Sequence, residues 1–163
     1  MRVHAATAEE TRALGTRLAP LLRAGDLLVL SGDLGAGKTT FTQGIGEGLQ
    51  VRGAVTSPTF VISRVHPSLV GGPALVHVDA YRLGSSAGPD GAALALDDLD
   101  LDTSLDEAVT VVEWGSGVAE ALADDRLEIE ILRAHGEEEG EARTLEVTAV
   151  GPRWADVDLR DLG

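Results

Sequence analysis

Lysine occurs once in this chain of 163 residues, and its position restricts what the chain can fold into. Lys38 lies in Gly-Asp-Leu-Gly-Ala-Gly-Lys-Thr at residues 32–39, which fits the pattern G-x-x-x-x-G-K-[ST] of a phosphate-binding loop. All other basic residues are arginines, although a planar guanidinium does not replace the compact ammonium that reaches the outer phosphates. The pattern therefore predicts a bound nucleoside triphosphate whose phosphates contact Gly35, Ala36, Gly37, Lys38, Thr39 and Thr40.

The segments on both sides of the loop match the strand and the helix that such a loop connects. Leu-Leu-Val-Leu at residues 27–30 is an apolar run typical of a buried strand. Apolar residues recur at helical spacing over residues 39–49, but Gly44, Gly46 and Gly48 interrupt them. Each glycine costs a helix about 1 kcal/mol relative to alanine. We therefore expect packing and bound phosphates to hold this helix.

The rest of the chain predicts an α/β protein. Thr-Ala-Glu-Glu at residues 7–10 is a capping box, which begins a helix that ends near Gly25. Apolar segments predict strands near 60–65, 75–79 and 109–113, and a β pair formed by 127–132 and 144–150. The length predicts a single domain over residues 1–163. Residues 151–163 give a weak signal, and we expect a frayed C-terminal tail there.

Missing residue types exclude several classes of site. The chain has no cysteine, which excludes disulfides, thiolate zinc sites and cysteine nucleophiles. It has no asparagine either, so the N-K-x-D guanine-reading motif of GTPases is impossible and ATP is the favoured nucleotide. The four histidines have no ligand-like spacing and are expected to be surface or strand residues.

The charge of the chain bears on its partners and its location. The net charge is −14, and most of the acidic residues lie between Asp90 and Glu141. Such a surface repels nucleic acid, so any RNA is expected to be held by a partner. We see neither a signal peptide nor a run of about 20 apolar residues, and we expect a cytoplasmic protein.

Two strand ends carry candidate magnesium-site carboxylates. Mg²⁺ prefers a few oxygen ligands from the protein, and the hydroxyl of Thr39 supplies one. Open α/β sheets bind ligands at the carboxyl ends of their strands, where Asp79 and Glu113 each follow an apolar run. The alternative for either residue is a solvated acid at a strand end. The acidic cluster at residues 97–102 lacks the glycine and glutamate positions of a calcium loop.

Four motifs in this order resemble the TsaE family, also known as YjeE. They are Gly-Asp-Leu-Gly-Ala-Gly-Lys-Thr-Thr-Phe at 32–41, Ser-Pro-Thr-Phe at 57–60, His-Val-Asp-Ala-Tyr-Arg-Leu at 77–83 and Val-Glu-Trp at 112–114. The resemblance implies a three-layer P-loop NTPase fold with a parallel core sheet and antiparallel edge strands. Members of the family are small bacterial ATPases, which act with TsaB, TsaD and TsaC to make N6-threonylcarbamoyladenosine (t6A) in tRNA.

The resemblance also implies a role for each matching residue. Lys38 and the surrounding amides hold the phosphates of ATP or ADP, and Thr39 and Glu113 bind Mg²⁺. Asp79 is needed for hydrolysis, because it positions water or metal. Thr59 acts like a switch near the γ-phosphate. The final motif puts Trp114 near the nucleotide or the partner surface, and tRNA is reached only through the complex.

The chain departs from the family pattern after Trp114 and over residues 84–106, where a Gly/Ser/Pro loop and aspartates replace a glutamate-rich segment. The main alternative function is a small-molecule kinase that uses the same loop. Such an enzyme closes an arginine-bearing lid over the phosphates, whereas Arg64 and Arg82 are the only basic residues between Arg52 and Arg126. A third interpretation is a nucleotide-loaded binding module whose hydrolysis resets partner association.

Overall fold

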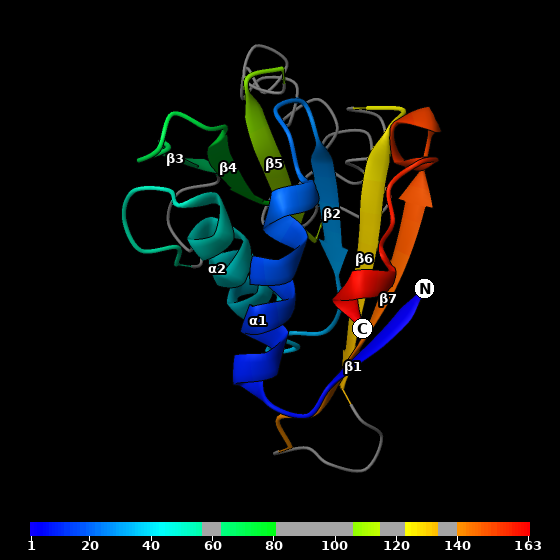
Figure 1. The fold of residues 1–163 in the computed structure, drawn as a ribbon. Coiled ribbons are helices and arrows are strands. Elements are labelled where there is room, and N and C mark those ends of the chain that lie inside the picture. The colour runs from blue at the N-terminus through cyan, green and yellow to red at the C-terminus, as the bar shows by residue number, and fades with distance from the viewer. Residues whose placement is uncertain (57–62, 81–105, 115–122, 134–139) are drawn as a thin grey trace.

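A computed structural model describes residues 1–56, 63–80, 106–114, 123–133 and 140–163. Within these residues, seven strands form one sheet in the order β1-β7-β6-β2-β5-β4-β3 (Figure 1). The strands are β1 (Arg2–Ala5), β2 (Leu27–Ser31), β3 (Ser63–His66), β4 (Ala74–Asp79), β5 (Ala108–Glu113), β6 (Arg126–Arg133) and β7 (Arg143–Val150). The sequence predicts all of them except β1.

The middle of the sheet is parallel and its edges are antiparallel. β2 pairs in parallel with β5 on one side and with β6 on the other, and β5 pairs in parallel with β4. β3, β7 and β1 add antiparallel pairs outside these four strands. The predicted parallel core with antiparallel edge strands is thereby confirmed. The connections from β4 to β5 and from β5 to β6 lie largely outside the described residues.

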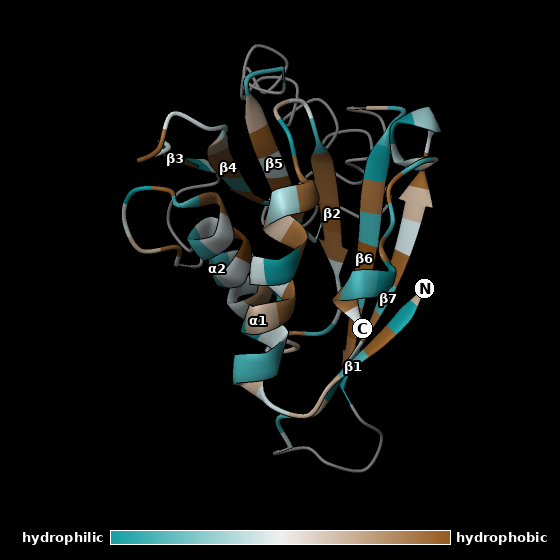
Figure 2. Cartoon of the chain, viewed as in Figure 1, coloured by the Kyte–Doolittle hydropathy of each residue, from teal (hydrophilic) through white to brown (hydrophobic). Residues whose placement is uncertain are grey.

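The strands differ in how much of their surface is buried, and the sequence shows why. β2 and β5 are buried along nearly their whole length, as expected for central parallel strands, and β2 is almost entirely hydrophobic in Figure 2. β6 instead alternates buried and more exposed residues, and Figure 2 shows the matching alternation of colour. Leu127, Ile129 and Ile131 are its fully buried side chains.

Two helices, α1 (Ala8–Leu18) and α2 (Lys38–Leu49), lie on one face of the sheet (Figure 1). The hydroxyl of Thr7 accepts from the N–H of Glu10 at 3.1 Å, and the carboxylate of Glu10 accepts from the N–H of Ala6 at 2.6 Å. The capping box is thus confirmed, with Glu10 reaching the residue before the cap. Among the described residues, no helix is long and apolar enough to cross a membrane.

The glycines of α2 allow the two helices to approach backbone to backbone. A Cβ atom on Gly44 would collide with the carbonyl oxygen of Arg12, and one on Gly15 would collide with that of Phe41. The hydroxyl of Thr16 donates across the contact to the carbonyl of Gly44 at 3.2 Å. Close packing therefore explains residues that are poor for an isolated helix.

The C-terminal residues are ordered, so the predicted frayed tail is wrong. η3 (Pro152–Trp154) and η4 (Arg160–Leu162) follow β7, and the side chains of Trp154 and Leu162 are buried. The guanidinium of Arg153 donates to both carboxylate oxygens of the buried Asp26 at 2.9 Å. Local periodicity gave no signal here, because this tail is held by single contacts with distant residues.

We expect Gly44→Ala to destabilise the protein although alanine is the better helix former. The added methyl overpacks the contact with α1 at a cost of about 1–3 kcal/mol, against a gain of about 1 kcal/mol in helix propensity. Urea unfolding should show a lower midpoint than in the original chain. The matched control is Gly72→Ala, whose Cβ meets, among the described residues, only the Ser68 hydroxyl at 3.6 Å. A higher midpoint for Gly44→Ala would contradict the backbone contact.

Candidate nucleotide-binding site

The carboxyl ends of β2, β5 and β4 meet at one edge of the sheet. Leu30 of β2 lies opposite Glu113 of β5, and Glu113 lies opposite Asp79 of β4. The loop that leaves β2 begins α2 at the same edge. Parallel pairing therefore gathers the loop and both predicted carboxylates, although they are up to about 80 residues apart in sequence.

The loop ends at a helix N-terminus shaped to receive an anion. Gly37 is the N-cap of α2 and has φ 107° and ψ 18°, a left-handed conformation that favours glycine. Within the part of the chain that the structure describes, no side chain caps this end of α2. The first backbone N–H groups of a helix carry a partial positive charge and point along its axis, which suits a phosphate group.

Lys38 is buried and held by the loop itself. Its ammonium donates to the carbonyl oxygens of Gly32 at 2.8 Å and of Asp33 at 2.9 Å. The ring of Trp114 lies on another side, with its centroid 3.8 Å from Nζ. Burial lowers the pKa of Lys38 from its ordinary value, while the negative charge of Glu113 acts in the opposite direction. The ammonium is therefore fixed in place beside the loop.

Glu113 is a buried carboxylate with two donors on one oxygen. Its Oε1 accepts from the hydroxyl of Thr39 at 3.1 Å and from Nε2 of His77 at 2.8 Å. His77 is fully buried within β4. The geometry thus brings together the two predicted magnesium ligands, Thr39 and Glu113. A hydroxyl and a carboxylate at the loop form an oxygen set that fits Mg²⁺, which keeps much of its water and takes few protein ligands.

Asp79 and Trp114 complete this edge. Asp79 is half-buried at the end of β4, beside Glu113 in the strand register. Trp114 follows β5 with φ 61°, a left-handed conformation that is uncommon outside glycine and is often found at functional sites. Its N–H donates to the carbonyl of Leu30 at 2.9 Å, which ties the residue to the end of β2.

Thr59 lies outside the described residues, so its switch role stays a prediction. Sequence reasoning did not find the Glu113 contact of His77, although a histidine inside an apolar strand needs a buried partner. It also missed Arg133 and Arg143, which donate to carbonyl oxygens of the phosphate loop. No local sequence pattern predicts these contacts, because the partners in each are about 100 residues apart in the sequence.

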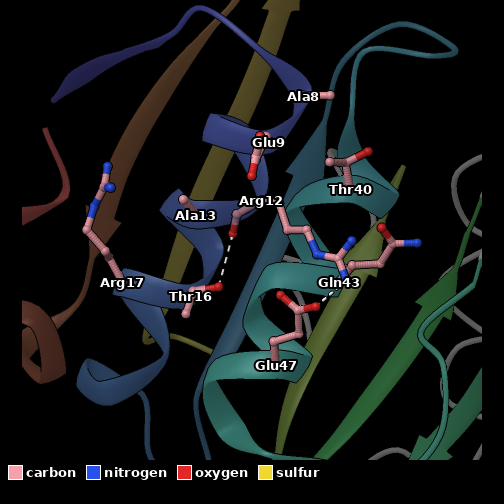
Figure 3. A pocket seen from close by; sticks show the side chains of 9 residues that line it. All are labelled: Ala8, Glu9, Arg12, Ala13, Thr16, Arg17, Thr40, Gln43 and Glu47. Atoms are coloured by element: carbon pink, nitrogen blue, oxygen red, sulfur yellow. Dashed lines mark hydrogen bonds and ion pairs between the residues drawn. The ribbon is translucent and has the colours of Figure 1, made fainter.

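A separate hollow of about 780 Å³ lies along the outer side of α1 and α2 (Figure 3). Arg12 and Glu47 form an ion pair across it, as the figure shows. Of the predicted phosphate-binding residues it contains only Thr40. Lys38 and Glu113 do not line it, so this hollow is distinct from the loop site.

The chain is similar to known proteins both in sequence and in structure. The family described as "Threonylcarbamoyl adenosine biosynthesis protein TsaE" matches residues 5–144. A curated TsaE protein from Streptomyces coelicolor is 63% identical over 148 residues, which cover 91% of this chain and 96% of the relative. The TsaE protein of Bacillus subtilis is 41% identical, over 90% of this chain and 84% of the relative. A crystal structure of Bacillus subtilis YdiB superposes with a TM-score of 0.71 and 34% identity, covering 94% of this chain and 88% of that one.

We expect His77→Ala to destabilise the fold, because it removes a buried donor from Glu113 and leaves a cavity. The loss in free energy of unfolding should be about 2–4 kcal/mol. His77→Gln should recover part of it, since the amide offers an N–H in place of Nε2. Chemical unfolding measures both variants.

The matched control is Thr110→Val on β5, a fully buried residue whose hydroxyl has no hydrogen-bond partner within the described residues. This nearly isosteric change should cost little. Equal stability of His77→Ala and the original chain would show that the contact with Glu113 contributes nothing.

Proposed function

The chain belongs to the TsaE family, and on this premise we propose that it is the Mg²⁺-dependent ATPase of the t6A system. Its relatives are named as proteins of tRNA threonylcarbamoyladenosine biosynthesis, and the family has the fold of P-loop nucleotide-binding proteins. The observation that carries the proposal is the placement of Lys38, Thr39 and Glu113 around one loop.

The phosphates of ATP or ADP are held by the loop, through the amides of residues 35–40 and the ammonium of Lys38. An ammonium has three N–H donors, and two of them are used by the carbonyls of Gly32 and Asp33. We assign the remaining donor to a phosphate oxygen.

Thr39 and Glu113 are the residues that hold Mg²⁺. A magnesium ion held there would supply positive charge against the negative charge that develops in phosphoryl transfer. His77 keeps the carboxylate of Glu113 in place by donating from Nε2. Asp79, at the neighbouring strand end, positions the attacking water or the metal. Thr59 is proposed to respond to the γ-phosphate as a switch.

The charge of the protein supports a division of labour with partners. A net charge of −14 opposes direct contact with a tRNA backbone, since such contact depends on Lys and Arg. We therefore propose that TsaB and TsaD hold the tRNA and stimulate turnover, as phosphoryl-transfer sites do when a partner supplies a missing group.

Lys38→Ala is expected to weaken Mg²⁺-ADP binding by about 100-fold or more, because a charge-assisted contact with phosphate is lost. Lys38→Arg should also bind weakly, since the loop encloses a compact ammonium. Isothermal titration calorimetry measures both. Arg160→Ala removes an equal charge at an exposed site near the C-terminus and serves as the control. Unchanged affinity in Lys38→Ala would remove the basis of the proposal.

ATP turnover is expected to be slow for the isolated chain and faster when TsaB and TsaD are present. Phosphate release is measured with each component alone and with all three together. The Lys38→Ala chain, mixed with the same partners, reports any turnover that does not come from this site. A gel shift with tRNA should show no binding by the isolated chain. Tight tRNA binding, or no stimulation by the partners, would favour the small-molecule kinase instead.

A further inference from the structure

Two arginines from the β6–β7 hairpin contact the phosphate loop. Arg133 ends β6, Arg143 begins β7, and the two residues lie opposite each other in the strand register. Nη2 of Arg133 donates to the carbonyl oxygen of Leu34 at 2.9 Å. Nε of Arg143 donates to that of Ala36 at 2.8 Å. The loop is therefore held from outside by a part of the sheet that belongs to neither its strand nor its helix.

These contacts constrain the direction of the loop amides. In a planar trans peptide the C=O and the N–H of one unit point in opposite directions. The carbonyl oxygen of Leu34 points toward Arg133, so the N–H of Gly35 in the same peptide unit points away from the hairpin. The carbonyl oxygen of Ala36 points toward Arg143, so the N–H of Gly37 also points away from the hairpin. The N–H of Ala36 is used inside the loop, where it donates to Asp33 at 3.0 Å. The arginines thus orient two amides of the predicted phosphate-binding set.

Arg143 also makes hydrogen bonds to its own segment of the chain. Its Nη1 donates to the carbonyls of Gly140 at 2.6 Å and of Ala142 at 2.8 Å. All the contacts described for this guanidinium go to neutral oxygens, so its positive charge stays beside the loop and attracts anions. Arg133 lies so close to Gly35 that a Cβ atom there would collide with it. A methyl there would make the guanidinium shift, whereas the φ of 74° at Gly35 is itself the reason for glycine at this position.

We propose that Arg133 and Arg143 are positioning residues that hold the phosphate loop in its nucleotide-binding conformation. They act on the phosphates through the peptide units of the loop. The inference rests on the proposed nucleotide binding and extends it to a hairpin that the loop motif does not include.

Titration calorimetry with Mg²⁺-ADP tests the inference on the intact chain. Arg133→Ala and Arg143→Ala should each weaken binding about tenfold, the loss expected for one hydrogen bond to a charged donor. Arg126→Ala is the matched control, because Arg126 stands at the opposite end of β6 and pairs with Glu128. Its affinity should equal that of the original chain.

A second variant separates positioning from charge. Arg143→Lys keeps the positive charge but loses the planar group that bonds Ala36 and the hairpin together. We expect it to bind as weakly as Arg143→Ala, and we expect the amide resonances of Gly35 and Gly37 to shift in both variants before nucleotide is added. Full recovery of affinity in Arg143→Lys would overturn the positioning role in favour of simple attraction.

These measurements distinguish failure of the positioning inference from failure of the proposed function. If the original chain does not bind Mg²⁺-ADP, the proposed function fails. If it binds and both alanine variants bind equally well, the positioning inference fails. Thermal unfolding identifies a variant that is not folded. Should Arg143→Ala be unfolded, Arg133→Ala and Arg143→Lys decide the question, since each leaves the other arginine in contact with the loop.

Discussion

The parallel register of β2, β5 and β4 is the constraint on which the site depends. It sets Leu30 opposite Glu113 and Glu113 opposite Asp79, so that one loop hydroxyl and one carboxylate come within 3.1 Å. A shift of one residue in β5 would turn Glu113 to the other face of the sheet, because side chains alternate along a strand. The apolar runs of these strands therefore have a second role besides filling the core, since they align the residues that follow them.

Burial gives the site its electrostatic character. Lys38 and Glu113 are both buried, which costs free energy unless each charge finds partners. Carbonyl oxygens and an aromatic ring surround the ammonium, and a histidine and a hydroxyl donate to the carboxylate. Electrostatic interactions are stronger in such a buried site than in water. The fold thus tolerates these charges by holding each in a set of directed contacts.

Sequence reasoning succeeded where the determinants are local. The phosphate loop, the capping box at Thr7 and the β pair of β6 and β7 are encoded in spacing and turn chemistry, and all are present in the fold. It failed for β1 and for the C-terminal tail, because four residues give little periodicity and the tail is held by contacts such as Arg153 with Asp26. The bonds of Arg133 and Arg143 to the loop are equally invisible in a one-dimensional pattern. The glycines of α2 looked unfavourable only because helix propensity ignores the neighbouring helix.

The order of strands in the sheet has a consequence for how the protein is made. β2 lies at the centre, yet its neighbours β5 and β6 begin at residues 108 and 126, and the arginines that bond the loop follow at 133 and 143. On a ribosome the loop is synthesised early. The strands and arginines that contact it are synthesised only when most of the chain has emerged. Folding dominated by such distant pairings is slow. A chain interrupted anywhere before the last hairpin would carry the nucleotide motif without the frame that shapes it.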